Sequence, residues 1–97
     1  MMDMEQLLLT KLAEECSEVI KLCMKAQQFG LDSINPDNGE VTRDMIYDEL
    51  NDIMGVVMYL NLVCKFNYQL DEDAANRKIE KVREYAKHSH GLGRVNL

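Results

Sequence analysis

Two pairs of carboxylates are the residues of this chain best placed to do chemistry. Glu15 and Glu18 stand three residues apart in a stretch without glycine or proline, and Glu49 and Asp52 repeat that spacing further along. At about 100° per residue, a helix turns each pair toward its own apolar stripe. An ionised carboxylate without a compensating partner costs several kcal/mol to bury, on the order of a folding free energy. Each pair therefore needs a base, a proton or a metal ion beside it.

The residues around these acids favour a divalent metal ion. No lysine or arginine lies at the centre of either stripe, so four converging carboxylates would repel one another. Oxygen ligands in an incomplete shell suit Mg²⁺, with Mn²⁺ as the second candidate, and leave room for water and phosphate oxygens. A di-iron site is disfavoured because it requires Glu-x-x-His on two helices, whereas His88 and His90 lie near the C-terminus. A single acid on such a stripe is usually a boundary residue that reaches solvent, but two matched pairs are much harder to explain in that way.

Helical periodicity predicts three helices to position these acids. The predicted helices cover residues 4–29, 42–66 and 72–88. Gly30 is expected to end the first helix, Thr42 to cap the second, and Asp71 to cap the third. Residues 31–40 have the composition of a turn-rich loop, and residues 89–97 are expected to be an irregular tail.

The expected fold class is all-α, with the whole chain of 97 residues forming one domain. The three helices are expected to stack on one another, with four residues of the third facing inward: Ala75, Ile79, Val82 and Ala86. Tyr59 and Phe66 are expected to pack in the core and not to stack on a ligand. Seven methionines and further aliphatic positions predict an apolar face that one chain cannot cover. A homodimer or a homotetramer would cover this face and complete a four-helix bundle.

Composition excludes several classes of protein. A net charge of −6 argues against nucleic acid as a partner. The longest apolar run, residues 53–60, is too short to cross a membrane, and the acidic start is unlike a basic signal peptide. The cysteines Cys16, Cys23 and Cys64 include no C-x-x-C pair, and we expect them to be reduced and buried. These features together predict a soluble, cytoplasmic protein.

The acidic motifs, taken together, resemble a known signature. Residues 14–18 (EECSE) followed by residues 49–52 (ELND) resemble the E-E-x-x-E and E-x-x-D motifs of the MazG-like, all-α nucleoside triphosphate pyrophosphohydrolases. Residues 76–83 (NRKIEKVR) are similar to the N-x-K and arginine segment of that family. The resemblance spans roughly residues 6 to 87, and the chain looks like the small single-domain members that phages often encode.

The resemblance implies hydrolysis of a nucleoside triphosphate between its α- and β-phosphates, which gives a monophosphate and pyrophosphate. It implies four Mg²⁺ ligands: Glu15, Glu18, Glu49 and Asp52. It also implies phosphate contacts from the third helix, supplied by the same or a neighbouring subunit: Asn76, Lys78 and Arg83. Glu18 or Glu49 would accept a proton from the attacking water, whereas Glu14 would orient a ligand or pair with a lysine of its helix.

Two other hypotheses remain open from the sequence. Phosphoribosyl-ATP pyrophosphohydrolase shares the fold and related acidic motifs, and a non-catalytic helical protein would use the acids to hold a structural ion. The distribution of charge favours a phosphorylated small molecule. Residues 1–75 contain five bases and fifteen acids, a net charge of −10, whereas residues 76–97 contain six bases and two acids, a net charge of +4. An acidic metal-binding part followed by a basic part suits a polyphosphate held between a metal ion and basic side chains.

Overall fold

The computed structural model describes residues 1–97 and contains three α-helices and no β-strand. The helices are α1 (Met4–Phe29), α2 (Thr42–Cys64) and α3 (Glu72–Gly91). The only β-type pairing is an isolated bridge between Ile34 and Val41 in the loop after α1. The predicted all-α class is therefore confirmed.

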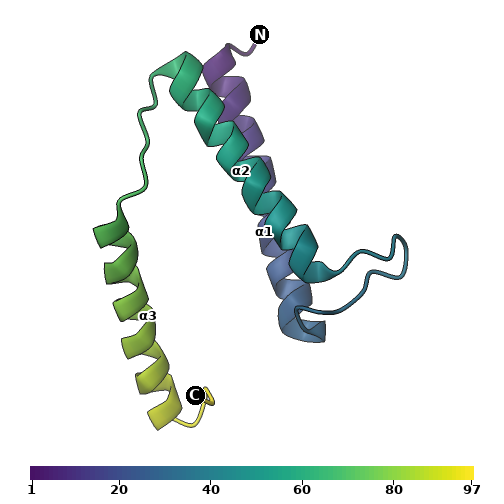
Figure 1. Cartoon of the computed structure of the whole chain (residues 1–97), viewed down its shortest axis with the longest axis vertical. Helices are drawn as coiled ribbons and strands as arrows, with labels where there is room; N and C mark the ends of the chain where they lie inside the picture. Colours follow the sequence, from purple (N-terminus) through teal and green to yellow (C-terminus); the bar gives the residue numbers. More distant parts are fainter.

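Helices α1 and α2 run antiparallel and pack against each other as a hairpin (Figure 1). A capping box begins α1: Asp3 accepts from the backbone N–H of Gln6, and Gln6 accepts in return from the backbone N–H of Asp3. Gly30 ends α1 with a φ of 95°, a value that favours glycine. Leu8, Leu22 and Leu60 are the buried apolar residues, and they mark the faces on which the two helices meet.

The loop between α1 and α2 is tied to the start of α2. The hydroxyls of Ser33 and Thr42 lie 2.7 Å apart, and the Arg43 guanidinium lies 3.1 Å from Asp32. The N-cap of α2 is Val41, so the prediction that Thr42 caps this helix is wrong. Thr42 is already the first residue of α2, and its buried hydroxyl bonds back to Ser33 of the loop and not to a backbone N–H of the helix.

The second and third helices end at other residues than expected. Helix α2 ends at Cys64, two residues early, because Lys65 adopts the left-handed conformation with a φ of 53°. Helix α3 continues to Gly91, so the prediction of an irregular segment from Ser89 is wrong for its first three residues. The following tail folds back and bonds to this last turn: the N–H of Arg94 donates to the carbonyl of Ser89 at 2.8 Å.

Helix α3 stands apart from the hairpin, after an extended segment (Figure 1). The prediction that its apolar residues face a core within the chain is wrong, since Ile79 and Val82 are each more than half exposed. The radius of gyration is 17.1 Å, whereas a compact chain of this length would have about 12.5 Å. One chain therefore forms a hairpin and a separate helix, not a stack of three helices.

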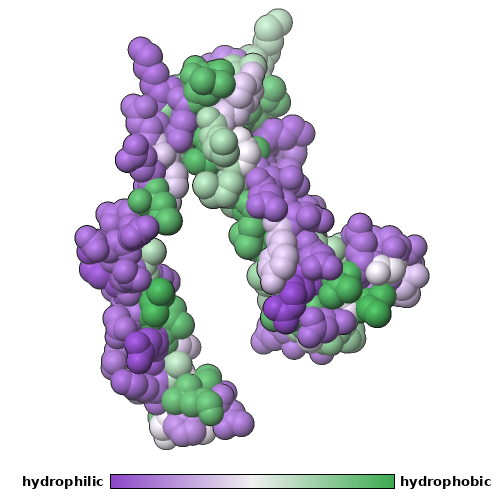
Figure 2. All heavy atoms as spheres, viewed as in Figure 1, coloured by the Kyte–Doolittle hydropathy of each residue, from purple (hydrophilic) through white to green (hydrophobic).

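A single chain leaves most of its apolar side chains exposed, over both the hairpin and α3 (Figure 2). Its accessible surface is 7941 Å², whereas a compact monomer of 11.2 kDa would expose roughly 5,700 Å². Tyr59 and Phe66 are nearly half exposed, so the prediction that they pack in the core is wrong. The cysteines Cys16 and Cys23 are also exposed, contrary to expectation. None of the three helices combines the length and the apolar character that crossing a membrane requires.

Candidate metal centre

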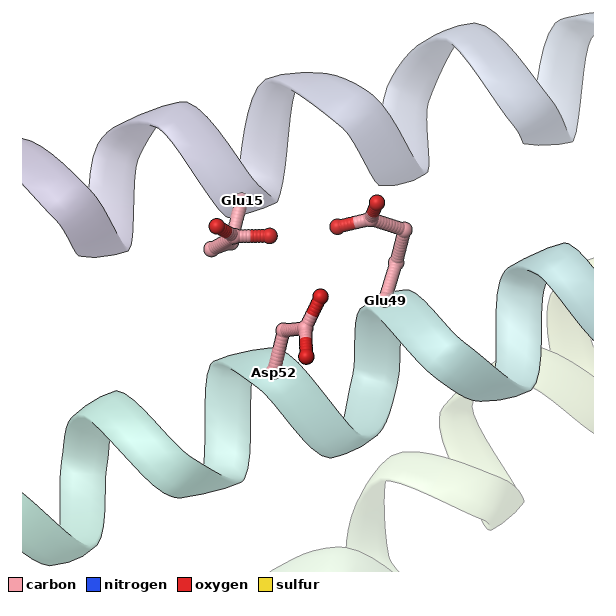
Figure 3. Close-up of side chains that lie close together, drawn as sticks. All are labelled: Glu15, Glu49 and Asp52. Carbon is pink, nitrogen blue, oxygen red and sulfur yellow. The ribbon is translucent and has the colours of Figure 1, made fainter.

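Three of the four predicted acids meet between α1 and α2. Glu15 projects from α1 toward Glu49 and Asp52 on α2 (Figure 3). Each residue offers one carboxylate oxygen, and these three oxygens all lie within 4.8 Å of one another. Ligand oxygens around an octahedral Mg²⁺ lie about 3 to 4 Å apart, so small side-chain adjustments would let the three oxygens share one ion.

The helices position these acids through the same periodicity that buries the leucines. Leu8, Glu15 and Leu22 follow one another at seven-residue intervals, which places them on one face of α1. On α2, Glu49 lies seven residues after the buried Thr42 and eleven before the buried Leu60. Packing of the two apolar faces therefore brings Glu15 and Glu49 together without a turn or a strained backbone.

The electrostatics of the cluster call for a cation. Oε2 of Glu49 is buried and has no hydrogen-bond partner. The pKa of Glu49 is raised from its ordinary 4.5 to about 7, first by a side-chain hydrogen bond with Glu15 and then by the loss of solvent around the carboxylate. The negative charges of Glu15, Asp52 and Glu18 raise it further. A divalent ion would satisfy the unpartnered oxygen and remove this repulsion, so the residues present fit a metal ion.

Glu18 and Glu14 lie outside this group of three candidate ligands. Glu18 lies one turn after Glu15, is half exposed and forms an ion pair with Lys21 at 3.3 Å. Its role as a fourth ligand stays a prediction, and it requires that Lys21 release the carboxylate. Glu14 forms an ion pair with Lys11 at 3.2 Å, which was one of its two predicted roles.

The predicted phosphate contacts lie on α3, away from the acids of the same chain. Asn76 and Arg83 are seven residues apart and share a face of α3, where Arg83 pairs with Glu80 at 3.0 Å. Lys78 is two residues after Asn76 and points to the opposite side of the helix. Lys78 instead lines a shallow hollow with Lys81, Val82 and Tyr85.

A hollow beside the acids is lined by further residues that the sequence pattern did not assign to a site. Glu15 and Asp52 form part of its wall, and Asn51, Gly55 and Tyr59 form another part. One signal in the sequence could have indicated it, because a glycine in the middle of a helix weakens the helix, and one kept there usually has a packing or functional reason.

The metal-free cluster is expected to make stability fall as pH rises. Because the pKa of Glu49 is higher in the folded chain than in the unfolded chain, its contribution is fully present below pH 4.5 and lost as pH rises through about 7. Thermal unfolding in a chelator should therefore give a lower Tm at pH 8 than at pH 5.5. Added Mg²⁺ should raise the Tm more at pH 8, where no proton competes for the site. Glu49→Gln is the control, and an unchanged pH dependence in this variant would contradict the assignment.

Comparison with known proteins identifies the family. No curated protein and no solved structure matches the chain significantly. A family model, described as the MazG nucleotide pyrophosphohydrolase domain, matches residues 4–90. The match spans all of α1 and α2, nearly all of α3, and every acid of the cluster. The chain therefore belongs to the MazG family of nucleotide pyrophosphohydrolases, which are hydrolases that act on acid anhydrides.

Proposed function

We propose that this protein is a Mg²⁺-dependent nucleoside triphosphate pyrophosphohydrolase, which cleaves between the α- and β-phosphates and yields a nucleoside monophosphate and pyrophosphate. One observation carries the proposal: Glu15, Glu49 and Asp52 converge in a chain of this family and leave a buried carboxylate oxygen without a partner. Mn²⁺ is the second candidate ion, since it also prefers oxygen ligands.

The four acids have different roles in the proposed reaction. A bound Mg²⁺ would neutralise charge on the phosphates and make a nearby water more acidic. Glu15, Glu49 and Asp52 would hold the ion, and they converge from two packed helices. Glu18 stands next to the group and either completes the ligand set or accepts the proton of the attacking water; Glu49 is the other candidate base. Either task requires that Glu18 leave its ion pair with Lys21.

The phosphate contacts in this proposal come from α3 of another subunit. Asn76, Lys78 and Arg83 remain the proposed contacts, but α3 does not touch the hairpin of its own chain. A homodimer or homotetramer in which a second copy lies against the hairpin can bring these side chains to the phosphates. Arginine would bind phosphate oxygens in a bidentate manner, and lysine would act as a point charge.

The surface of α2 supports such an assembly. A stripe of large apolar residues runs along the side of α2 that α1 leaves uncovered, and it consists of Leu50, Met54, Met58 and Leu62. These side chains are 47% to 78% exposed. The excess surface of the chain over a compact monomer is roughly 2,000 Å², which lies in the range buried by obligate dimers.

Three free cysteines fit a reducing compartment, and we propose a cytoplasmic location.

A screen for pyrophosphate release tests the proposed function. The protein is incubated with ribonucleoside and deoxyribonucleoside triphosphates, with Mg²⁺, Mn²⁺ or a chelator, and phosphoribosyl-ATP is included as a competing substrate. We expect release from at least one triphosphate with Mg²⁺ and none in the chelator. Preference for phosphoribosyl-ATP would replace the substrate in this proposal. A folded sample that raises its Tm with metal but turns over no nucleotide would instead indicate a binding protein with a structural ion.

A further inference from the structure

A hollow adjoins the acidic cluster on the side toward the end of α2, with a volume of about 540 Å³. Glu15 and Asp52 line it, so a ligand held by the acids would lie at its edge. Its other lining residues are Leu8, Asn51, Gly55, Val56 and Tyr59. The hollow is mainly apolar away from the acids, which suits a flat apolar group attached to a charged chain.

Gly55 lines this hollow without adding a side chain to it. It lies in the middle of α2, where alanine would make the helix more stable. Its backbone needs no positive φ, and a Cβ at this position would meet no atom within 4 Å. Neither backbone conformation nor packing within the chain therefore requires glycine here. What a larger side chain would change is the space beside Asp52.

Tyr59 offers an aromatic ring at a suitable distance from the acids. It lies seven residues after Asp52, on the same face of α2 and about 10 Å further along the helix axis. Its side chain is 44% exposed, so part of the ring is free to contact a ligand. A ribose with its phosphate chain can span this separation. Asn51, also exposed, places an amide at the wall of the same hollow.

The apolar stripe on α2 leaves the hollow accessible. Asn51, Gly55 and Tyr59 each follow a stripe residue by one position, which turns them about 100° around the helix. A second copy that covers the stripe can therefore leave the hollow open. The pocket at the other end of the hairpin, lined by Phe29 and Ile34, is less suitable because none of the acids contributes to it.

We propose that this hollow holds the nucleoside part of the substrate, with the base stacked on Tyr59 and Gly55 kept free of a side chain to admit it. The inference rests on the proposed function, since it assumes a nucleotide whose phosphates lie at the acidic cluster. It assigns Gly55 and Tyr59 as residues that determine nucleotide binding and take no part in holding the metal ion.

Two variants test the proposal in the full-length protein. Gly55→Leu should raise KM for the best triphosphate at least about tenfold, while the extra Tm conferred by Mg²⁺ stays unchanged. Tyr59→Leu should raise KM about five- to 150-fold, the range for loss of one base–aromatic contact. The Ki of the nucleoside monophosphate should rise with it, and the Ki of inorganic tripolyphosphate should not.

Matched controls separate binding from folding. Gly91→Ala adds a side chain at another open helical glycine, and Tyr68→Leu removes a tyrosine of equal exposure, so both should keep the wild-type KM. Gly55→Ala should raise the Tm by about 4 °C as glycine leaves the helix, and it should still raise KM. A higher Tm with unchanged KM in Gly55→Ala and Gly55→Leu would overturn the proposal.

The failure of this proposal is distinguishable from that of the proposed function. If the wild-type protein hydrolyses a nucleotide but the variants keep its KM, only the hollow is wrongly assigned. If the wild-type protein hydrolyses none, NMR titration with a Mg²⁺–nucleoside triphosphate still decides. Shifts of the Asn51 and Gly55 amides, lost in Tyr59→Leu, would support the hollow as a nucleotide site, and unchanged spectra would overturn it.

Discussion

Replacing Glu49 by glutamine is expected to lower pyrophosphate release by more than about 100-fold, because even indirect partners of a metal contribute 10- to 100-fold. Glu49 combines three properties in one side chain: it lies within the group of three candidate ligands, its Oε2 has no partner, and its pKa is raised to about 7. Glutamine keeps the size of the side chain but supplies no negative charge. The measurement is kcat/KM for the best triphosphate under saturating Mg²⁺.

The fold is expected to survive this substitution, because glutamine removes like-charge repulsion from the metal-free cluster. The Tm in a chelator at pH 8 should be equal to or higher than that of the wild-type protein, and the rise in Tm on adding Mg²⁺ should disappear. Glu14→Gln is the matched control, since Glu14 neighbours Glu15 in sequence but pairs with Lys11 at the surface. Equal losses of activity in the two variants would contradict the assignment of the ligands.

Placing two lysines on the exposed stripe of α2, as Met58→Lys with Leu62→Lys, is expected to dissociate the proposed assembly and abolish turnover together. Charged groups in an apolar interface cost several kcal/mol, so the dissociation constant should rise at least about 100-fold. Turnover should fall because the proposed phosphate contacts, Lys78 and Arg83, would no longer reach the acids of another chain. Sedimentation and activity, measured at the same protein concentration, report the two effects.

The control variant adds the same charge at a different place on the surface. Gln27→Lys with Gln28→Lys adds the same two positive charges at exposed positions of α1, away from the stripe. This double variant should keep the wild-type mass and turnover. If the stripe variant sediments as the wild-type protein does, the stripe is not the interface. If it dissociates into single chains that retain full turnover, the contribution of α3 from another subunit is wrong.

The hairpin and the acid cluster were predictable because they depend on local rules. Gly30 ends α1 and Asp71 caps α3, as the residue types indicate. Glu15 and Glu49 meet because each shares a face with buried residues of its own helix, and a helical period is enough to show this. The family assignment followed from the same residues.

The placement of α3 and of Glu18 could not be read from these rules. The apolar residues of α3 have the right spacing to face inward, but periodicity does not say whether the surface they meet belongs to the same chain. Glu18 has the right spacing to join Glu15, yet Lys21, one turn on, competes for its carboxylate. The longer α3 depends on the tail folding back onto Ser89, a contact that no helical pattern specifies.

The most direct test of cleavage between the α- and β-phosphates at the acidic cluster is to identify the reaction products. The protein, Mg²⁺ and the best triphosphate from the screen are followed by ³¹P NMR, with Glu49→Gln and a chelator as parallel samples. We expect nucleoside monophosphate and pyrophosphate in equal amounts, and neither product in the two parallel samples. Formation of a nucleoside diphosphate and orthophosphate, or equal turnover by Glu49→Gln, would contradict this expectation.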